Sequence, residues 1–178
     1  MSLPHIFLVG PMGSGKTTVG RFLARRMGLD FRDLDQEIER RCGVDVRTIF
    51  DIEGEEGFRK REHALLDELT AGTPLLLATG GGSVLRADNR DLLRARGLVV
   101  WLKTRIDQQI RRLDKDQRRP LLQAPDREER LQKLAEIRDP LYAECAHLTV
   151  QSDNVSPMQM AHRAAKKIHH HLESEQVS

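Results

Sequence analysis

Residues 6–17 read Ile-Phe-Leu-Val-Gly-Pro-Met-Gly-Ser-Gly-Lys-Thr, and this stretch of the 178-residue chain decides the fold. Its last eight residues fit the pattern G-x-x-x-x-G-K-[ST] at every fixed position. In that pattern, unpaired backbone N–H groups at a helix N-terminus surround phosphate oxygens, and glycines keep side chains out of the way. The sequence therefore predicts a binding loop for a nucleoside triphosphate.

The segments on either side of the loop have the character that this role requires. Residues 6–9 are an apolar run typical of a buried parallel strand, and residues 17–27 have apolar side chains at helical spacing. We expect Lys16 to reach the β- and γ-phosphates and the Thr17 hydroxyl to bind Mg²⁺. A simple glycine-rich turn is the alternative, and the order strand, loop, helix argues against it.

Apolar runs alternate with helical patterns along the chain, which predicts an α/β fold with a parallel sheet. The expected strands are 6–9, 29–34, 75–79, 98–102 and 148–150. The expected helices are 17–27, 36–41, 55–70, 90–96, 106–113, 128–138 and 156–172. We interpret residues 1–178 as one domain with a core at 4–172, and the polar, proline-containing segment at about 114–127 as a mobile lid.

Composition limits the class of protein. The formal net charge is +2 with both signs interspersed, so we expect no nucleic-acid partner. The first apolar run has four residues, so we expect neither a signal peptide nor a membrane span. The two cysteines lie far apart, which favours a reduced, cytoplasmic protein. Three adjacent histidines, 169–171, suit a solvated helix end better than a metal site.

Two further features are expected at the edge of the sheet that carries the loop, because ligands bind at the carboxyl ends of parallel strands. The second expected strand ends in Asp33-Leu34-Asp35, and Gly80-Gly81-Gly82 follows the third. Asp35 could orient or deprotonate an attacking hydroxyl, and Asp33 could lie in the outer shell of Mg²⁺. A helix N-cap followed by a first-turn acid is an equally open interpretation of the two aspartates.

Two arginines complete the predicted site. Arg59 lies on an expected helix three residues before Glu62, so Glu62 is expected to hold its guanidinium group. Arg138 is expected at the end of a helix, just before Pro140. Two arginines aimed at one point would clamp a carboxylate or a phosphate, because each guanidinium can donate two parallel hydrogen bonds. Solvated surface charge is the alternative for each arginine.

Together these motifs resemble those of the bacterial shikimate kinase family over nearly the whole chain. The matching segments are 10–20, 33–35, 53–59, 78–84, 119–122 and 138–142. The resemblance implies transfer of the γ-phosphoryl group of ATP to the 3-hydroxyl of shikimate, in aromatic amino-acid biosynthesis. It also implies a monomeric P-loop kinase of the nucleoside-monophosphate-kinase type, with a five-stranded parallel sheet in the order 2-3-1-4-5.

The resemblance also implies a role for each site residue. Phosphates would bind to Gly13, Ser14, Gly15, Lys16, Thr17 and Thr18, and Mg²⁺ to Thr17 with Asp33 behind it. Shikimate would bind to Asp35, Arg59, Arg138, Gly80, Gly81 and Gly82, with the helical segment at about 33–62 supplying much of its site. Arg119 would close from the lid as a catalytic residue beside Lys16 and Asp35, and Arg112 would lie against adenine.

Two alternatives stay open. A kinase for gluconate or for a nucleoside monophosphate would need the same loop and could use the same arginines. A GTPase switch or an ATP-dependent regulatory module belongs to a different class of protein. The chain contains no Asn-Lys-x-Asp guanine motif, which argues against the GTPase.

Overall fold

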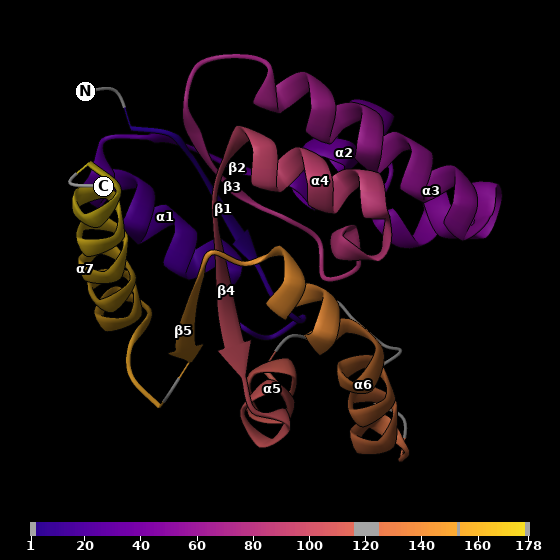
Figure 1. Ribbon diagram of the computed structural model, residues 1–178. Coiled ribbons are helices and arrows are strands. Elements are labelled where there is room, and N and C mark those ends of the chain that lie inside the picture. The colour runs from indigo at the N-terminus through magenta and orange to yellow at the C-terminus, as the bar shows by residue number, and fades with distance from the viewer. Residues whose placement is uncertain (1–2, 116–124, 153, 177–178) are drawn as a thin grey trace.

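Five parallel strands form one sheet at the centre of the protein, with helices on both of its faces (Figure 1). This computed structural model describes residues 3–115, 125–152 and 154–176. The strands are β1 (His5–Val9), β2 (Asp30–Asp33), β3 (Leu75–Ala78), β4 (Gly97–Thr104) and β5 (Leu148–Ser152). Their order, β2-β3-β1-β4-β5, confirms the predicted α/β fold and the predicted order 2-3-1-4-5.

Helices connect the strands and cover the sheet. The α-helices are α1 (Lys16–Met27), α2 (Leu34–Cys42), α3 (Val46–Thr70), α4 (Ala87–Arg96), α5 (Ile106–Leu113), α6 (Arg127–Cys145) and α7 (Pro157–Gln176), and η1 (Ser83–Leu85) is a short 3-10 helix. α1 and α7 cover one face of the sheet, and α3 and α4 cover the other (Figure 1). Within the described ranges, no helix is long and apolar enough to cross a membrane.

The apolar run before the loop is the central strand, β1. It pairs with β3 on one side and with β4 on the other, and its five residues are all buried. Ile6 and Leu8 belong to the core under α1 and α7, whereas Phe7 and Val9 belong to the core on the opposite face. Successive side chains of a strand point to opposite faces, so a central strand with both faces covered needs consecutive apolar residues.

The helix before β3 is longer than predicted. α3 begins at Val46, whereas the sequence predicted a helix over 55–70. Asp45 caps the extra first part by accepting a hydrogen bond from the Thr48 N–H at 2.8 Å. Gly54 interrupts the helix with φ of 71° and ψ of 179°. The break at Gly54 divides the helical pattern of apolar residues into two segments. The first segment, 46–53, is too short for its periodicity to predict a helix.

The helix that carries Arg138 also extends past its predicted end. α6 continues through Pro140 to Cys145, so Arg138 lies inside the helix and not at its end. A proline removes one backbone donor and usually interrupts a helix. Here Tyr142 and Cys145 are fully buried in the core, and this packing outweighs the lost hydrogen bond. Arg138 and Tyr142, four residues apart, therefore share one face of α6.

The two aspartates after β2 lie at the start of a helix. β2 ends at Asp33 and α2 begins directly at Leu34, so Asp35 lies in the first turn of α2 and not at a strand end. The interpretation of the two aspartates as an N-cap and a first-turn acid is confirmed. Asp33 is the N-cap, and its Oδ1 accepts a hydrogen bond from the Gln36 N–H at 3.0 Å. Carboxylates at this position are stabilised by the unpaired N–H groups and the dipole of the helix.

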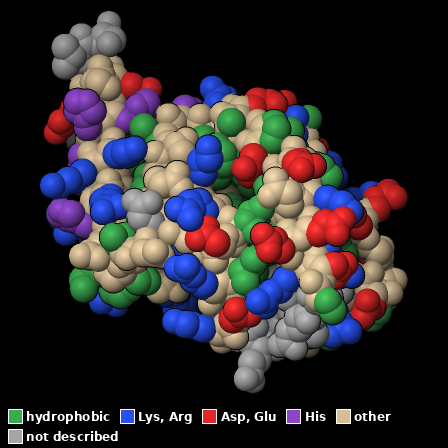
Figure 2. Space-filling view, turned by 90° about the horizontal axis from the view of Figure 1, so that it is seen from below, with side chains coloured by type: hydrophobic (Ala, Val, Ile, Leu, Met, Phe, Trp, Pro, Cys, Tyr) green, Lys and Arg blue, Asp and Glu red, His purple; other side chains and the backbone are tan. Residues whose placement is uncertain are grey.

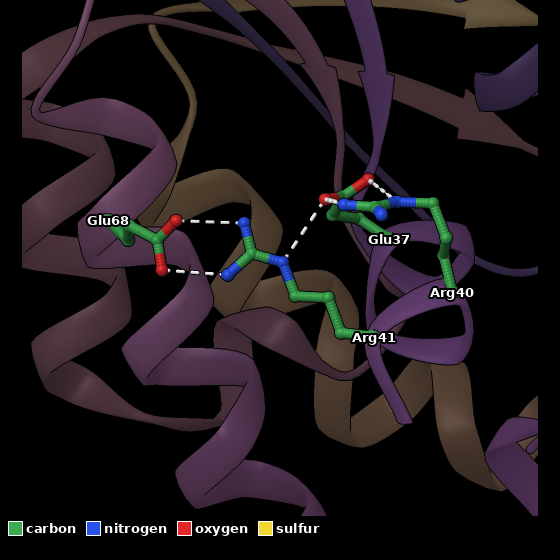
Figure 3. Close-up of polar contacts among 4 residues, drawn as sticks. All are labelled: Glu37, Arg40, Arg41 and Glu68. Carbon is green, nitrogen blue, oxygen red and sulfur yellow. Dashed lines mark hydrogen bonds and ion pairs between the residues drawn. The ribbon is translucent and has the colours of Figure 1, made fainter. Parts of the chain in front are cut away.

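Ion pairs hold α2 against α3 (Figure 3). Glu37 accepts a hydrogen bond from Arg40 Nη2 at 2.6 Å and another from Arg41 Nε at 3.1 Å. Arg41 also donates two bonds of 2.8 Å to the two carboxylate oxygens of Glu68 in α3. The hydrogen bond from Arg40, assisted by Arg41, lowers the pKa of Glu37 to about 2. Because the contact with Glu68 is bidentate, it restricts the orientation of α2 on α3.

Two histidines join neighbouring strands through their ring nitrogens. His5 Nδ1 accepts a hydrogen bond from the Leu75 N–H at 3.2 Å, and His147 Nδ1 accepts one from the Val99 N–H at 3.0 Å. A ring nitrogen can accept a hydrogen bond only while it carries no proton. Burial lowers the pKa of both histidines below the ordinary value. Protonation of either ring therefore opposes folding.

The double variant His5→Asn/His147→Asn tests this pH dependence. We expect the free energy of unfolding of the wild-type protein to fall as the pH drops below about 6.5, because the unfolded chain then binds protons that the folded chain does not. One such proton gives a slope approaching about 1.4 kcal/mol per pH unit. An asparagine oxygen can accept the same N–H without titrating, so the double variant should lose this part of the slope. Urea unfolding at several pH values measures it.

His162 in α7 provides the control for this experiment because its side chain is exposed. Its ring meets solvent in both the folded and the unfolded state, so His162→Asn should leave the slope as it is in the wild-type protein. A slope that survives in the double variant would show that neither His5 nor His147 links folding to protons.

Candidate functional site

The loop between β1 and α1 forms an open set of backbone donors. Gly13 and Gly15 have φ values of 77° and 89°, which favour glycine, and Gly15 is the N-cap of α1. Among the described residues, no side chain caps this helix and no acidic residue lies in its first turn. The first N–H groups of α1, from Lys16 through Thr18, therefore face the loop without a helical acceptor. Such a helix start attracts anions, phosphate above all.

Lys16 places a positive charge directly over this loop. Its side chain is 9% exposed, and its Nζ donates hydrogen bonds to the carbonyl oxygens of Gly10 at 2.6 Å and Pro11 at 2.9 Å. The hydroxyl of Ser14 lies 3.4 Å from the same nitrogen, and this residue is fully buried. The ammonium group thus lies beside the N–H groups that would hold phosphate oxygens.

Thr17 and Asp33 bring the loop and the start of α2 into contact. Thr17 Oγ1 donates a hydrogen bond of 2.5 Å to Asp33 Oδ2, while the other carboxylate oxygen of Asp33 caps α2. Capping of α2 by Oδ1 leaves Oδ2 beside Thr17, so it is compatible with the predicted place of Asp33 behind a metal ion. A hydroxyl and a carboxylate next to a phosphate-binding loop are oxygen ligands of the kind that suits Mg²⁺.

The glycine turn after β3 is the point where the predicted acceptor residues meet. A Cβ on Gly80 would lie 2.9 Å from Asp35 Oδ1, and a Cβ on Gly81 would lie 3.3 Å from Arg138 Nη1. A Cβ on Gly82 would overlap the guanidinium group of Arg59. Three side chains from α2, α3 and α6 thus converge on a stretch of backbone that has no room for side chains of its own.

Arg59 is held firmly against this turn. Its side chain is 12% exposed, and its Nη1 donates a hydrogen bond of 2.8 Å to Glu62, which is fully buried. The guanidinium carbon lies 5.9 Å from the ring centre of Phe50 and 5.2 Å from that of Phe58. The predicted contact between Glu62 and Arg59 is confirmed. Packed between aromatic rings and a carboxylate, Arg59 is not a freely solvated surface charge.

Tyr142 is a residue of this site that the sequence analysis did not single out. Its hydroxyl donates a hydrogen bond of 2.5 Å to the carbonyl oxygen of Gly81, and the side chain is fully buried. Burial raises the pKa of this phenol, with smaller effects from neighbouring charges such as Arg138. Its spacing of four residues from Arg138 could have indicated that the two side chains share one helix face. That spacing is informative only when the helix is known to pass through Pro140.

A cleft open to solvent connects the loop with α6. The cleft is shallow, and its lining includes Pro11, Met12, Gln109, Arg138 and Tyr142. The cleft lies at the carboxyl edge of the sheet, which carries both acidic and basic side chains on its surface (Figure 2). The phosphate loop and Arg138 therefore border the same opening.

Arg112 supports the loop from α5. Its Nη1 donates hydrogen bonds to the carbonyl oxygens of Gly13 at 3.1 Å and Ser14 at 3.0 Å, and to the Ser152 hydroxyl at 2.9 Å. Burial lowers the pKa of its guanidinium group. These contacts give Arg112 a structural role beside the predicted role at adenine. Arg119 and most of the predicted lid lie outside the described residues.

Comparison with known proteins agrees with this arrangement. The model of the family described as shikimate kinase matches residues 12–169. Shikimate kinase of Vibrio cholerae is 49% identical over 168 residues, which cover 94% of this chain and 97% of that protein. Shikimate kinase of Shewanella oneidensis is 52% identical over 164 residues, which cover 92% of this chain and 96% of that protein.

Solved structures give the same result. Shikimate kinase from Acinetobacter baumannii in complex with shikimate has a TM-score of 0.89 and 47% identity, and the match covers 99% of this chain and 96% of that one. A gluconokinase from Sinorhizobium meliloti, with a TM-score of 0.59 and 16% identity, shares the fold alone and covers 99% of this chain and 98% of that one. The chain belongs to the shikimate kinase family.

Proposed function

We propose that this protein transfers the γ-phosphoryl group of ATP to the 3-hydroxyl of shikimate, giving shikimate 3-phosphate and ADP in aromatic amino-acid biosynthesis. The observation that carries the proposal is the convergence of Asp35, Arg59 and Arg138 on the glycine turn at residues 80–82, next to the phosphate loop. Family membership and the shikimate complex of the Acinetobacter baumannii relative support it.

The chemistry of the acceptor matches this set of side chains. Shikimate is a small ring with one carboxylate and three hydroxyl groups. Arg59 and Arg138 would bind the carboxylate through charge-assisted hydrogen bonds, and the backbone of the turn at 80–82 would complete that end of the site. Asp35 would bind the hydroxyl groups, including the one that attacks, and would orient it or take its proton.

The donor half of the site would be built by the loop and its neighbours. The N–H groups of the segment 13–18 would bind phosphate oxygens, and Lys16 would exchange its bonds to loop carbonyls for bonds to the β- and γ-phosphates. Thr17 would bind Mg²⁺ directly, and Asp33 would act behind it. When bound, Mg²⁺ neutralises charge on the β- and γ-phosphates. Arg119 would add a mobile positive charge from the lid, a role that stays a prediction.

Several finer expectations stay predictions. They are the contact of Arg112 with adenine, the single-domain organisation with a lid at about 114–127, the monomeric state, the cytoplasmic location and the lack of a nucleic-acid partner.

The proposed acceptor is tested by a coupled ADP-release assay with Mg²⁺-ATP. Shikimate is compared with no acceptor, with gluconate and with a nucleoside monophosphate. We expect rapid release with shikimate alone, because two arginines and one carboxylate match its two ends. Faster release with gluconate or with the nucleotide would overturn the choice of acceptor while leaving the phosphate loop intact.

Arg59→Ala tests the carboxylate clamp. Loss of its charge-assisted hydrogen bonds should raise the shikimate KM roughly 10- to 150-fold, with little change in the KM for ATP. Steady-state kinetics with each substrate varied in turn measures both constants. The matched control is Arg61→Ala, since Arg61 lies on the same helix and is paired with Glu53 at the surface. A rise in the KM for ATP, with shikimate unaffected, would place Arg59 on the nucleotide instead.

Asp33→Asn separates the capping role of this side chain from its role near the metal ion. Asparagine caps a helix about as well as aspartate, so thermal stability should change little. Loss of the charge behind Thr17 should raise the Mg²⁺ concentration for half-maximal rate roughly 10- to 100-fold. Titration of the rate with Mg²⁺ at fixed ATP measures this shift. Asp45→Asn, at the N-cap of α3, is the control and should leave the titration unchanged.

A further inference from the structure

A series of hydrogen bonds connects Arg59 with residues of two neighbouring elements. From Arg59 it passes to Glu62, then to Ser83, then to Asn89, and it ends at His63. Glu62, Ser83 and Asn89 are each fully buried. They come from three different elements, α3, η1 and α4.

The two oxygens of Glu62 have different partners. Oε1 accepts the hydrogen bond of 2.8 Å from Arg59 Nη1, and Oε2 accepts one of 2.7 Å from the Ser83 hydroxyl. A buried carboxylate is tolerated only when it is paired and hydrogen-bonded. The Ser83 hydroxyl therefore fixes the rotation of the carboxylate, and the carboxylate in turn fixes the guanidinium group of Arg59.

Asn89 fixes the backbone that carries Ser83. Its Nδ2 donates a hydrogen bond of 2.9 Å to the Ser83 carbonyl oxygen. Because a carbonyl oxygen only accepts, the orientation of the amide group is determined, and Asn89 Oδ1 faces His63 Nδ1 at 2.7 Å. That ring nitrogen must then carry the hydrogen. The Asn89 side chain therefore donates through Nδ2 to Ser83 and accepts through Oδ1 from His63.

We propose that Ser83 and Asn89 are positioning residues for the acceptor, which act through Glu62 on Arg59. They touch neither reactant in the proposed site, and they set the direction in which Arg59 presents its guanidinium group. The glycine turn adds to this restriction, because Arg59 lies against Gly82 where even a Cβ would overlap it. This inference rests on the proposed function, since it assigns Arg59 to the shikimate carboxylate.

The test compares the removal of two buried hydroxyl groups. Ser83→Ala deletes the bond to Glu62. The control, Thr70→Val, deletes another buried hydroxyl, at the end of α3, which donates to the Leu66 carbonyl oxygen and accepts from Arg96. Ser83→Ala removes one hydrogen bond to a buried carboxylate, and Thr70→Val removes one bond to a helix carbonyl and one from the Arg96 guanidinium group. Thermal unfolding of both variants is therefore measured beside the kinetics, so that a loss of stability is separated from a loss of positioning. Of the two hydroxyl groups, only that of Ser83 is linked to Arg59, through Glu62.

We expect Ser83→Ala to raise the shikimate KM roughly threefold to tenfold and to leave the KM for ATP unchanged. Asn89→Ala should also raise the shikimate KM. Thr70→Val should change neither the KM for shikimate nor the KM for ATP. Equal KM values for shikimate in Ser83→Ala, in Thr70→Val and in the wild-type protein would overturn the proposal. So would a rise in both KM values, because that pattern indicates a general loss of structure.

A double-mutant cycle with Glu62→Gln tests the route of the effect. If Ser83 acts through Glu62, the cost of Ser83→Ala for shikimate binding should shrink in the Glu62→Gln background. Additive effects would show a different route and would overturn the proposal. Wild-type turnover of shikimate is measured first: its absence contradicts the proposed function, whereas normal turnover with unshifted variants contradicts the positioning role alone.

Discussion

The turn that follows β3 leaves little room for side chains of its own, and the proposed acceptor half of the site depends on this constraint. Asp35, Arg59 and Arg138 approach the backbone of residues 80–82 so closely that a Cβ would crowd or overlap each of them. Glycine allows such an approach because it has no Cβ. The three charged groups can therefore share one small region, which three ordinary residues at the turn would have filled.

The arginines at this turn are restrained from different parts of the fold. Arg59 is held by Glu62, with Ser83 and Asn89 behind it, whereas Arg138 lies on α6 one helical turn from Tyr142. Tyr142 also fixes the turn itself through the Gly81 carbonyl oxygen. Because buried polar groups are costly when unpaired, these networks favour one arrangement of the turn and both arginines.

The sequence predicted the features that depend on local geometry. The phosphate loop follows from its motif, and the contact between Arg59 and Glu62 follows from their spacing on a helix. Features that depend on packing between distant segments could not be predicted. α6 passes through Pro140 because Tyr142 and Cys145 are buried. Ser83 contacts Glu62, and Asn89 contacts Ser83, only in the folded chain, since no local pattern links η1 and α4 to α3.

The start of α2 links the two halves of the site. Asp33 contacts Thr17 at the phosphate loop, and Asp35, two residues later, faces the glycine turn. The short connection between them lies in a capped first helical turn, so its geometry is nearly rigid. α2 is in turn held to α3, the helix of Arg59, by the pair of bonds from Arg41 to Glu68. One short helix therefore sets the spacing between the proposed donor and acceptor residues, and in-line phosphoryl transfer depends on that spacing.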